Sequence, residues 1–153
     1  MTSISLRAAT AQDLPFIVRL IHEDAVGGNS AEKPEDAGRG AYAEAFAAIN
    51  ADPNQMLMIA EIDGQPAGTF QLTFTPGIAR QGQWRCTIEG VHVDPALRNK
   101  GIGAQMMKWA LNTARERGCG LVQLTSNKAR EDAHRFYRRL GFAQSHEGFK
   151  ITM

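Results

Sequence analysis

Apolar and polar residues alternate or gather in short runs along much of the chain, and such runs predict strands. The first run, SISLRAA, alternates as a half-buried strand does. Two longer runs flank Asp63-Gly64, a pair that readily takes the positive φ values of a tight hairpin turn. Strands are therefore predicted at residues 3–9, 55–62, 65–76, 84–93 and 121–126, with one or two more in 142–153.

Apolar residues three or four positions apart predict the helices between these strands. Leu14, Ile17 and Ile21 have this spacing, and Thr10 with Asp13 resembles a capping box at the start of their helix. Helices are predicted from there to about residue 26, in the Ala-rich stretch 34–50, and over 102–117 and 130–140, the last two ending at a glycine. The order strand, two helices, three strands, helix, strand, helix, strand indicates an α/β domain.

Composition narrows the class of protein. The 153 residues suffice for one domain, and 43% hydrophobic with 22% charged residues is typical of a globular chain. A net charge of +1 gives no field that would draw nucleic acid or a membrane, and no apolar run is long enough to cross one. The start of the chain does not resemble a secretory leader, so a cytoplasmic protein with reduced Cys86 and Cys119 is expected. The four histidines lack metal-ligand spacing, so no metal is expected.

The stretch ALRNKGIGAQMM, residues 96–107, carries the clearest functional signal. A P-loop requires Lys and then Ser or Thr after the second glycine, but Ala104 and Gln105 stand there. A dinucleotide fingerprint requires a third glycine where Met106 stands, so that interpretation is weak. Glycines at a helix start let backbone N–H groups approach an anion closely, and Arg98 and Lys100 add positive charge. We interpret the segment as an anion cradle, with a glycine-rich helix entry without ligand as the alternative.

Two segments together resemble a known family. VHVDPALRNKGIGAQMMKWALNTARERGC is similar to the acyl-CoA-binding segment of the GCN5-related N-acetyltransferases, a strand followed by R/Q-x-x-G-x-G/A and a helix. HRFYRRLGF resembles a later helix of the same family, which carries a tyrosine, a leucine and a Gly-Phe step. The resemblance implies a single α/β (α+β) domain over residues 1–153, with a mixed, mostly antiparallel sheet splayed at its centre and flanked by helices.

The resemblance also implies a site for acetyl-CoA. In the family, backbone amides of the glycine segment hold the pyrophosphate, and the preceding strand pairs with the pantetheine arm and the acetyl carbonyl. Relatives often have an asparagine that contacts the arm, and Arg130 stands at its position here; either Asn127 takes over this contact or Arg130 reaches a phosphate of CoA. The implied cofactor-binding residues are Val91, His92, Val93, Arg98, Asn99, Lys100, Gly101, Ile102, Gly103, Ala104, Asn127 and Arg130.

Two side chains are candidates for proton transfer. Glu89 occupies a strand position where many relatives carry a carboxylate that deprotonates the acceptor amine. The same position also suits a solvated carboxylate or one paired with Arg85. Tyr137 matches the family tyrosine that protonates the departing thiolate, although its place on an apolar helix stripe also fits the core.

The resemblance therefore implies transfer of an acetyl group from acetyl-CoA to an amine by direct attack. The alternatives are a catalytically silent acyl-CoA-binding module, a nucleotide-binding domain of another class and a purely structural domain. The acceptor, a small-molecule amine or a peptide, is not identified by any residue, and the family also admits a homodimer.

Overall fold

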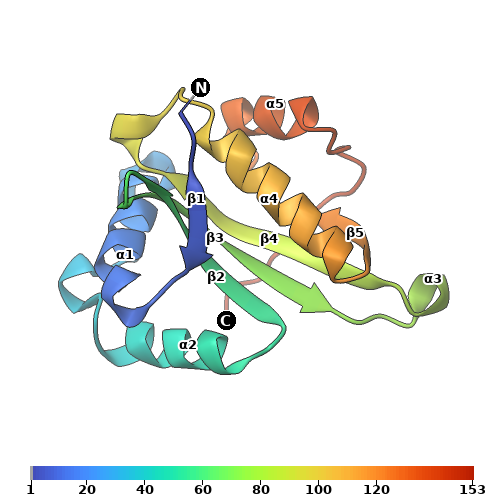
Figure 1. Cartoon of the computed structure of the whole chain (residues 1–153), viewed down its shortest axis with the longest axis horizontal. Coiled ribbons are helices and arrows are strands. Elements are labelled where there is room, and N and C mark those ends of the chain that lie inside the picture. The colour runs from blue at the N-terminus through green and yellow to red at the C-terminus, as the bar shows by residue number, and fades with distance from the viewer. Residues whose placement is uncertain (1) are drawn as a thin grey trace.

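A single sheet of five strands organises the computed structural model, which describes residues 2–153 (Figure 1). The strand order is β1-β2-β3-β4-β5; the pairs β1–β2, β2–β3 and β3–β4 are antiparallel, and β5 is parallel to β4. The predicted mixed, mostly antiparallel sheet is thus confirmed. The strands are β1 (Ser5–Ala8), β2 (Gln55–Ile62), β3 (Gln65–Thr75), β4 (Trp84–Val93) and β5 (Cys119–Gln123).

Helices cover both faces of this sheet. They are α1 (Leu14–Glu23), α2 (Gly40–Ala51), α4 (Ile102–Glu116) and α5 (Glu131–Arg139). The short turn α3 (Ala79–Gly82) lies in the connection between β3 and β4 (Figure 1). Alternate residues of β2 separate the two faces: Met58 and Ala60 join the core under α4, whereas Ile59 packs with Ile17 of α1. Figure 1 shows α4 running along the sheet with α5 beside it, while α1 and α2 lie apart from both.

The main core lies between α4 and the sheet. Met106, Met107 and Ala110 of α4 are fully buried against Phe70 and Leu72 of β3. Gly68 allows this close approach, because a Cβ there would lie 2.9 Å from both the His92 carbonyl oxygen and the Met106 sulfur. None of the helices in the described part of the chain is long and apolar enough to cross a membrane.

The splay at the centre of the sheet is also confirmed. β5 pairs only with Trp84 to Thr87, so residues 88–93 of β4 have no strand beside them on that edge within residues 2–153. A bulge lies in the unpaired half: the register places Phe70 of β3 opposite both Gly90 and Val91, and Gly90 has a φ of +60°. A bulge bends a strand and increases its twist, which here separates β4 from β5.

Three of the sequence-based boundaries were wrong. The predicted strands in 142–153 do not form in the described chain; the segment is irregular and exposed after Phe142. A strand needs a neighbour to satisfy its backbone groups, and this segment finds none. α1 ends at Glu23 rather than near residue 26, and α2 begins only at Gly40, which has a φ of +57°.

Candidate functional site

The unpaired half of β4 forms the base of the candidate site. Val91 and Val93 turn their side chains into the core, while His92 points to the opposite face, toward α1. Residues 88–93 have no strand beside them on the edge toward β5 within residues 2–153. The sequence predicts that an extended ligand pairs with Val91, His92 and Val93 along this edge.

The glycine segment follows β4 directly. A short 3-10 turn, Pro95–Leu97, is capped by the Asp94 side chain, which accepts a hydrogen bond from the Ala96 backbone N–H at 3.0 Å. Asn99 and Gly101 then take positive φ values of 63° and 76°, and α4 begins at Ile102. The first N–H groups of a helix lack intrahelical partners and lie at the positive end of its dipole, so they can hold an anion.

The sequence indicated that Gly103 lets the backbone approach an anion, but the structure places this glycine against a side chain of α5. A Cβ at this position would lie 3.3 Å from the Phe136 ring and 3.9 Å from Val93. Its missing side chain therefore lets α5 pack against the start of α4, and it does not simply open the loop to a ligand.

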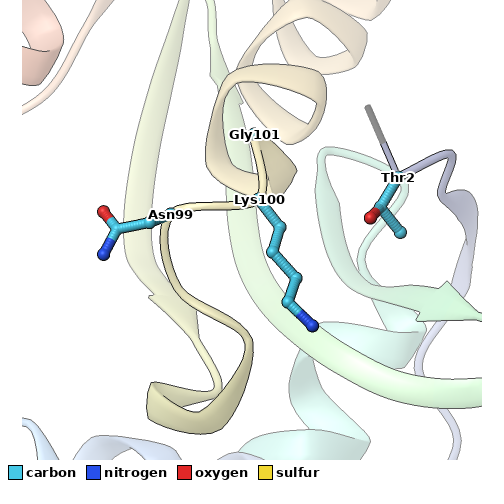
Figure 2. A pocket seen from close by; sticks show the side chains of 4 residues that line it. All are labelled: Thr2, Asn99, Lys100 and Gly101. Atoms are coloured by element: carbon cyan, nitrogen blue, oxygen red, sulfur yellow. The ribbon is translucent and has the colours of Figure 1, made fainter.

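An open hollow of about 600 Å³ adjoins this segment (Figure 2). Thr2, Asn99, Lys100 and Gly101 line it, and the Lys100 side chain points to the side where Thr2 lies while Asn99 points away. Gln105 of α4 fixes the N-terminal segment here, because its side chain bonds the Thr2 carbonyl and accepts from the Ile4 N–H. Sequence reasoning missed this wall, since the contacts join residues about one hundred positions apart.

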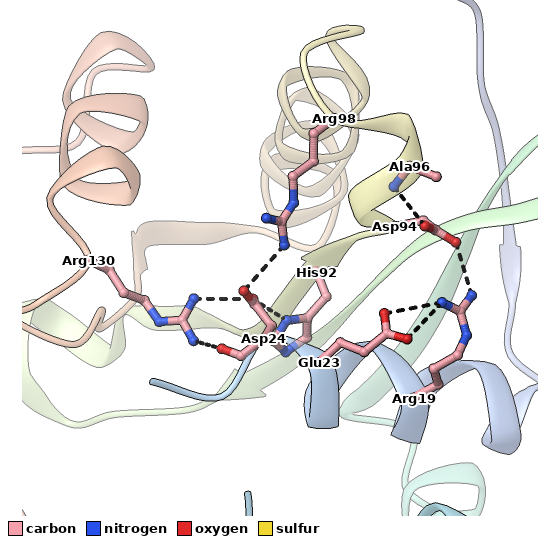
Figure 3. Close-up of polar contacts among 8 residues, drawn as sticks. All are labelled: Arg19, Glu23, Asp24, His92, Asp94, Ala96, Arg98 and Arg130. Atoms are coloured by element: carbon pink, nitrogen blue, oxygen red, sulfur yellow. Dashed lines mark hydrogen bonds and ion pairs between the residues drawn. The ribbon is translucent and has the colours of Figure 1, made fainter. Parts of the chain in front are cut away.

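Asp24, just after α1, is the centre of an ionic cluster that sequence reasoning also missed (Figure 3). Its carboxylate accepts from His92 Nδ1 at 2.8 Å and lies 3.3 Å from a guanidinium nitrogen of Arg98 and 3.1 Å from one of Arg130. Arg130 also donates to the Asp24 backbone carbonyl. The cluster thus joins the end of α1, β4, the glycine segment and the residue before α5.

Asp24 is held in its charged form. Its partial burial raises the pKa of the carboxyl, but the hydrogen bonds from His92 and Arg130 outweigh this and leave the pKa below its ordinary value. No local sequence signal marks Asp24, because its partners lie between 68 and 106 residues away.

A second ionic link joins α1 to the end of β4. Arg19 lies 2.9 Å from Asp94 and 3.2 Å from Glu23, with its guanidinium 5.4 Å from the centre of the Phe16 ring. Together with Asp24, this link fixes α1 beside the unpaired half of β4 (Figure 3).

Tyr137 is half-buried on α5, between the rings of Phe136 and Phe142 at 5.1 and 5.9 Å. Burial raises the pKa of its phenol; Arg130 opposes this and Asp24 adds to it, with a net rise. With this raised pKa the phenol is protonated at neutral pH. Its hydroxyl bonds no other residue in the described chain and is not fully enclosed, so it can contact a ligand.

The remaining predicted residues have different surroundings. Glu89 is exposed on β4, opposite Gln71 of β3, and forms no ion pair with Arg85 within residues 2–153. Asn127 is exposed and its side chain accepts from the Ala129 N–H, whereas Arg130 reaches the Asp24 cluster. The structure brings His92, Arg98 and Arg130 together around Asp24. The Asn127 carbonyl accepts a hydrogen bond from the Arg130 backbone N–H at 3.0 Å, but the Asn127 side chain does not join the cluster.

Neither cysteine has the properties of an activated nucleophile. Burial raises the pKa of the Cys86 thiol to about 11 and also raises that of Cys119, so both are neutral thiols at physiological pH. They are unpaired, as expected.

This arrangement, a splayed strand followed by a glycine-rich helix start, agrees with a comparison to protein families. Residues 16–142 match the model of the acetyltransferase (GNAT) family. The chain belongs to the GNAT family. Its members use acetyl-CoA, and the predicted transfer of an acetyl group to an amine is confirmed as the class of reaction, without the identity of the acceptor.

Relatives of this GNAT protein support the assignment. The aminoalkylphosphonate N-acetyltransferase of Salmonella typhimurium is 33% identical over 152 residues, which cover 99% of this chain and 92% of the relative. The streptothricin acetyltransferase of Streptomyces lavendulae is also 33% identical, over 84% of this chain and 58% of its own length. The crystal structure of a transcriptional regulator from Bacillus halodurans C-125 shares 44% identity and a TM-score of 0.92, covering 99% of this chain and 100% of that one.

Proposed function

We propose that this enzyme binds acetyl-CoA along the unpaired half of β4 and acetylates a small-molecule amine by direct attack. The observation that carries the proposal is the free edge of residues 88–93, which leads directly into the glycine-rich start of α4. The amides from Arg98 to Ala104, together with the side chain of Lys100, would hold the pyrophosphate, and Val91, His92 and Val93 would pair with the pantetheine arm.

The residues present fit this substrate. The edge of β4 offers a peptide-like arm the hydrogen bonds that β5 does not make. Arg98 is half-exposed and Arg130 one-third exposed, so each can exchange part of its contact with Asp24 for a phosphate or carbonyl oxygen. The proposal therefore assigns the family asparagine's place to Arg130 rather than to Asn127.

Two side chains would then move protons. Glu89, directly or through water, takes the proton that the acceptor amine loses as its nitrogen bonds to the acetyl carbon. Tyr137 gives its proton to the sulfur as the carbon–sulfur bond breaks, and a phenol with a raised pKa is fully protonated for this task. Because the cysteines are neutral thiols, no acyl-enzyme step is assigned to them.

Both cysteines are unpaired, and unpaired thiols suit a reducing compartment, which supports a cytoplasmic enzyme. The acceptor class follows from the relatives, which act on aminoalkylphosphonates and on streptothricin. We therefore propose small, polar primary amines, rather than peptides, as the class of acceptor.

An acceptor panel tests the proposal. Aminoalkylphosphonates, streptothricin, amino sugars, amino acids and a peptide with a free N-terminus are each incubated with enzyme and acetyl-CoA, and released thiol is measured. We expect turnover with at least one small amine and none without acceptor. Binding of acetyl-CoA by calorimetry without turnover of any acceptor would instead support a catalytically silent module.

A further inference from the structure

Glu89 and His92 of β4 face the same side of the sheet, although they are three positions apart. Successive residues of a strand point to opposite faces, so a separation of three would normally place the two side chains on different faces. The bulge opposite Phe70 removes this difference, because Gln71 pairs with Glu89 and Thr69 pairs with His92. Both side chains therefore lie on the face that α1 covers, at a spacing of about 7 Å for two residues along a strand.

The ring of His92 has one nitrogen that is held and one that is open. Nδ1 lies 2.8 Å from the Asp24 carboxylate (Figure 3). An ionised carboxylate only accepts hydrogen bonds, so Nδ1 carries a hydrogen and the neutral ring has its lone pair on Nε2. Nε2 bonds no residue within residues 2–153 and is not fully enclosed, so it can contact a ligand. A histidine that is oriented by a carboxylate and open at its other nitrogen has the arrangement of a general base.

The charges around this histidine come from four elements and balance one another. Asp24, just after α1, shares its carboxylate among His92, Arg98 of the glycine segment and Arg130 before α5. The other charged groups of α1 and of the end of β4 pair among themselves: Arg19, Glu23 and Asp94. The Asp24 carboxylate is thus not committed to an imidazolium alone, and the ring can exchange a proton with a substrate.

An acceptor amine has two protons to lose in the proposed reaction. An alkyl amine reaches the enzyme as an ammonium ion at neutral pH, because its pKa is about 10, like that of lysine. One proton must leave before the nitrogen has a lone pair with which to attack, and a second leaves as the nitrogen bonds to the acetyl carbon. Glu89 is proposed to take the second proton, which leaves the first to another group.

We propose that His92, oriented by Asp24, is a catalytic residue that takes the first proton from the bound acceptor ammonium at Nε2; this inference rests on the proposed acetyl transfer. The N–H bond of the ammonium breaks, and the nitrogen keeps the electron pair that attacks the acetyl carbon. Glu89 takes the second proton, and Tyr137, on the α4 side of the sheet, protonates the sulfur. Water then returns the proton of Glu89 to Tyr137, and His92 releases its own to solvent. One proton is thus released for each acetyl group transferred.

Two acceptors of different basicity test this role. One is the aminoalkylphosphonate or amino sugar with the highest turnover in the acceptor panel, and the other is its aminooxy counterpart, which is already neutral at neutral pH. His92→Gln can still donate to Asp24 but has no basic nitrogen, and His146→Gln changes an exposed histidine beyond α5 as the control. We expect kcat/KM for the amine to fall roughly 10- to 100-fold in His92→Gln through a higher KM, because the variant uses only the neutral fraction of the amine. The aminooxy acceptor, the affinity for acetyl-CoA and the control should be unaffected.

Nitrogen-15 NMR of the His92 ring gives a second readout, which does not depend on turnover. The neutral ring of the wild type should carry its hydrogen on Nδ1. In Asp24→Asn the amide can donate as well as accept, so the hydrogen should distribute over both nitrogens and kcat/KM for the amine should fall.

Three results would overturn the role of His92 in an active wild type. They are a hydrogen fixed on Nε2, unchanged kinetics in His92→Gln, and an equal loss of kcat/KM for both acceptors, which would indicate a structural role. A wild type that turns over no amine would instead contradict the acetyl transfer itself, and the inference with it. Circular dichroism confirms that each variant is folded.

Discussion

At the scale of single residues, the side chains of the candidate site differ in the number of contacts that hold them. Asp24 and His92 are fixed by several short contacts, whereas Glu89 is exposed and the Tyr137 hydroxyl bonds no residue of the described chain. The groups proposed to bind and orient the substrate are thus held by contacts within the protein, while the two groups proposed to move protons during the attack are still open to a ligand. This division leads to three substitutions with different expected results.

Tyr137→Phe removes only the phenol oxygen and keeps the ring between Phe136 and Phe142. Because that oxygen bonds no other residue, we expect stability to change by less than about 1 kcal/mol. Turnover should fall roughly 10- to 100-fold, since the thiolate loses its proton donor. Melting temperature, acetyl-CoA affinity and turnover are measured on the same variant; full turnover would return Tyr137 to a packing role.

Glu89→Gln keeps the size of the side chain and removes its basicity. We expect turnover to fall by roughly 100-fold with acetyl-CoA affinity unchanged, and the acidic limb of the pH–rate profile to disappear. Glu44→Gln, another exposed glutamate, on α2, serves as the control and should keep the wild-type profile. An unaltered acidic limb in the Glu89 variant would assign proton removal to another group.

Asp24→Asn removes the charge that His92, Arg98 and Arg130 share. We expect a loss of about 1–3 kcal/mol in the free energy of unfolding, because three cationic or polar groups lose their anion. Asp36→Asn breaks only an exposed pair with Arg39 and should cost under about 0.5 kcal/mol. Chemical denaturation measures both; equal losses would show that the cluster contributes no more than a surface pair.

At the scale of elements, the sequence predicts well whatever depends on neighbouring residues. The hairpin follows from Asp63-Gly64, and α4 follows from an apolar stripe bounded by glycines. The segment 142–153 has an equally regular alternation, but a strand also needs a partner edge, which the alternation does not supply. For the same reason the pattern does not reveal that β5 accompanies only the first half of β4.

The site divides along the same line. The glycine segment and Tyr137 could be predicted as site residues because they belong to contiguous motifs. Asp24 was not, because its contacts reach β4 and the start of α5 across most of the chain. The reason for Gly103 was incomplete in the same way, since Phe136 approaches it only in the folded molecule.

At the scale of the whole molecule, buried or half-buried carboxylates link stability to pH. The hydrogen bond from Arg7 lowers the pKa of Asp13, burial opposes this, and the net pKa is below its ordinary value. The unfolded chain therefore binds this proton more readily, so the contribution of the carboxylate is complete above about pH 5 and is lost as the pH falls below about 4.

Asp13→Asn tests this linkage. We expect the variant to be less stable than wild type at pH 6.5 by about 1–3 kcal/mol, and the difference to shrink as the pH approaches 3. Urea denaturation at several pH values measures it. Parallel pH profiles for the two proteins would show that Asp13 titrates alike in the folded and unfolded chains.

The free edge of β4 has one more consequence, which concerns the end of the reaction. Acetyl-CoA is proposed to be held by the N–H groups at the start of α4 and by the edge of residues 88–93. These groups would contact the pyrophosphate and the pantetheine arm of acetyl-CoA, which the reaction leaves unchanged. Coenzyme A without its acetyl group would therefore occupy the same place with nearly the same affinity. The enzyme would be inhibited competitively by its own product, and its rate in a cell would follow the ratio of acetylated to free coenzyme rather than the amount of either.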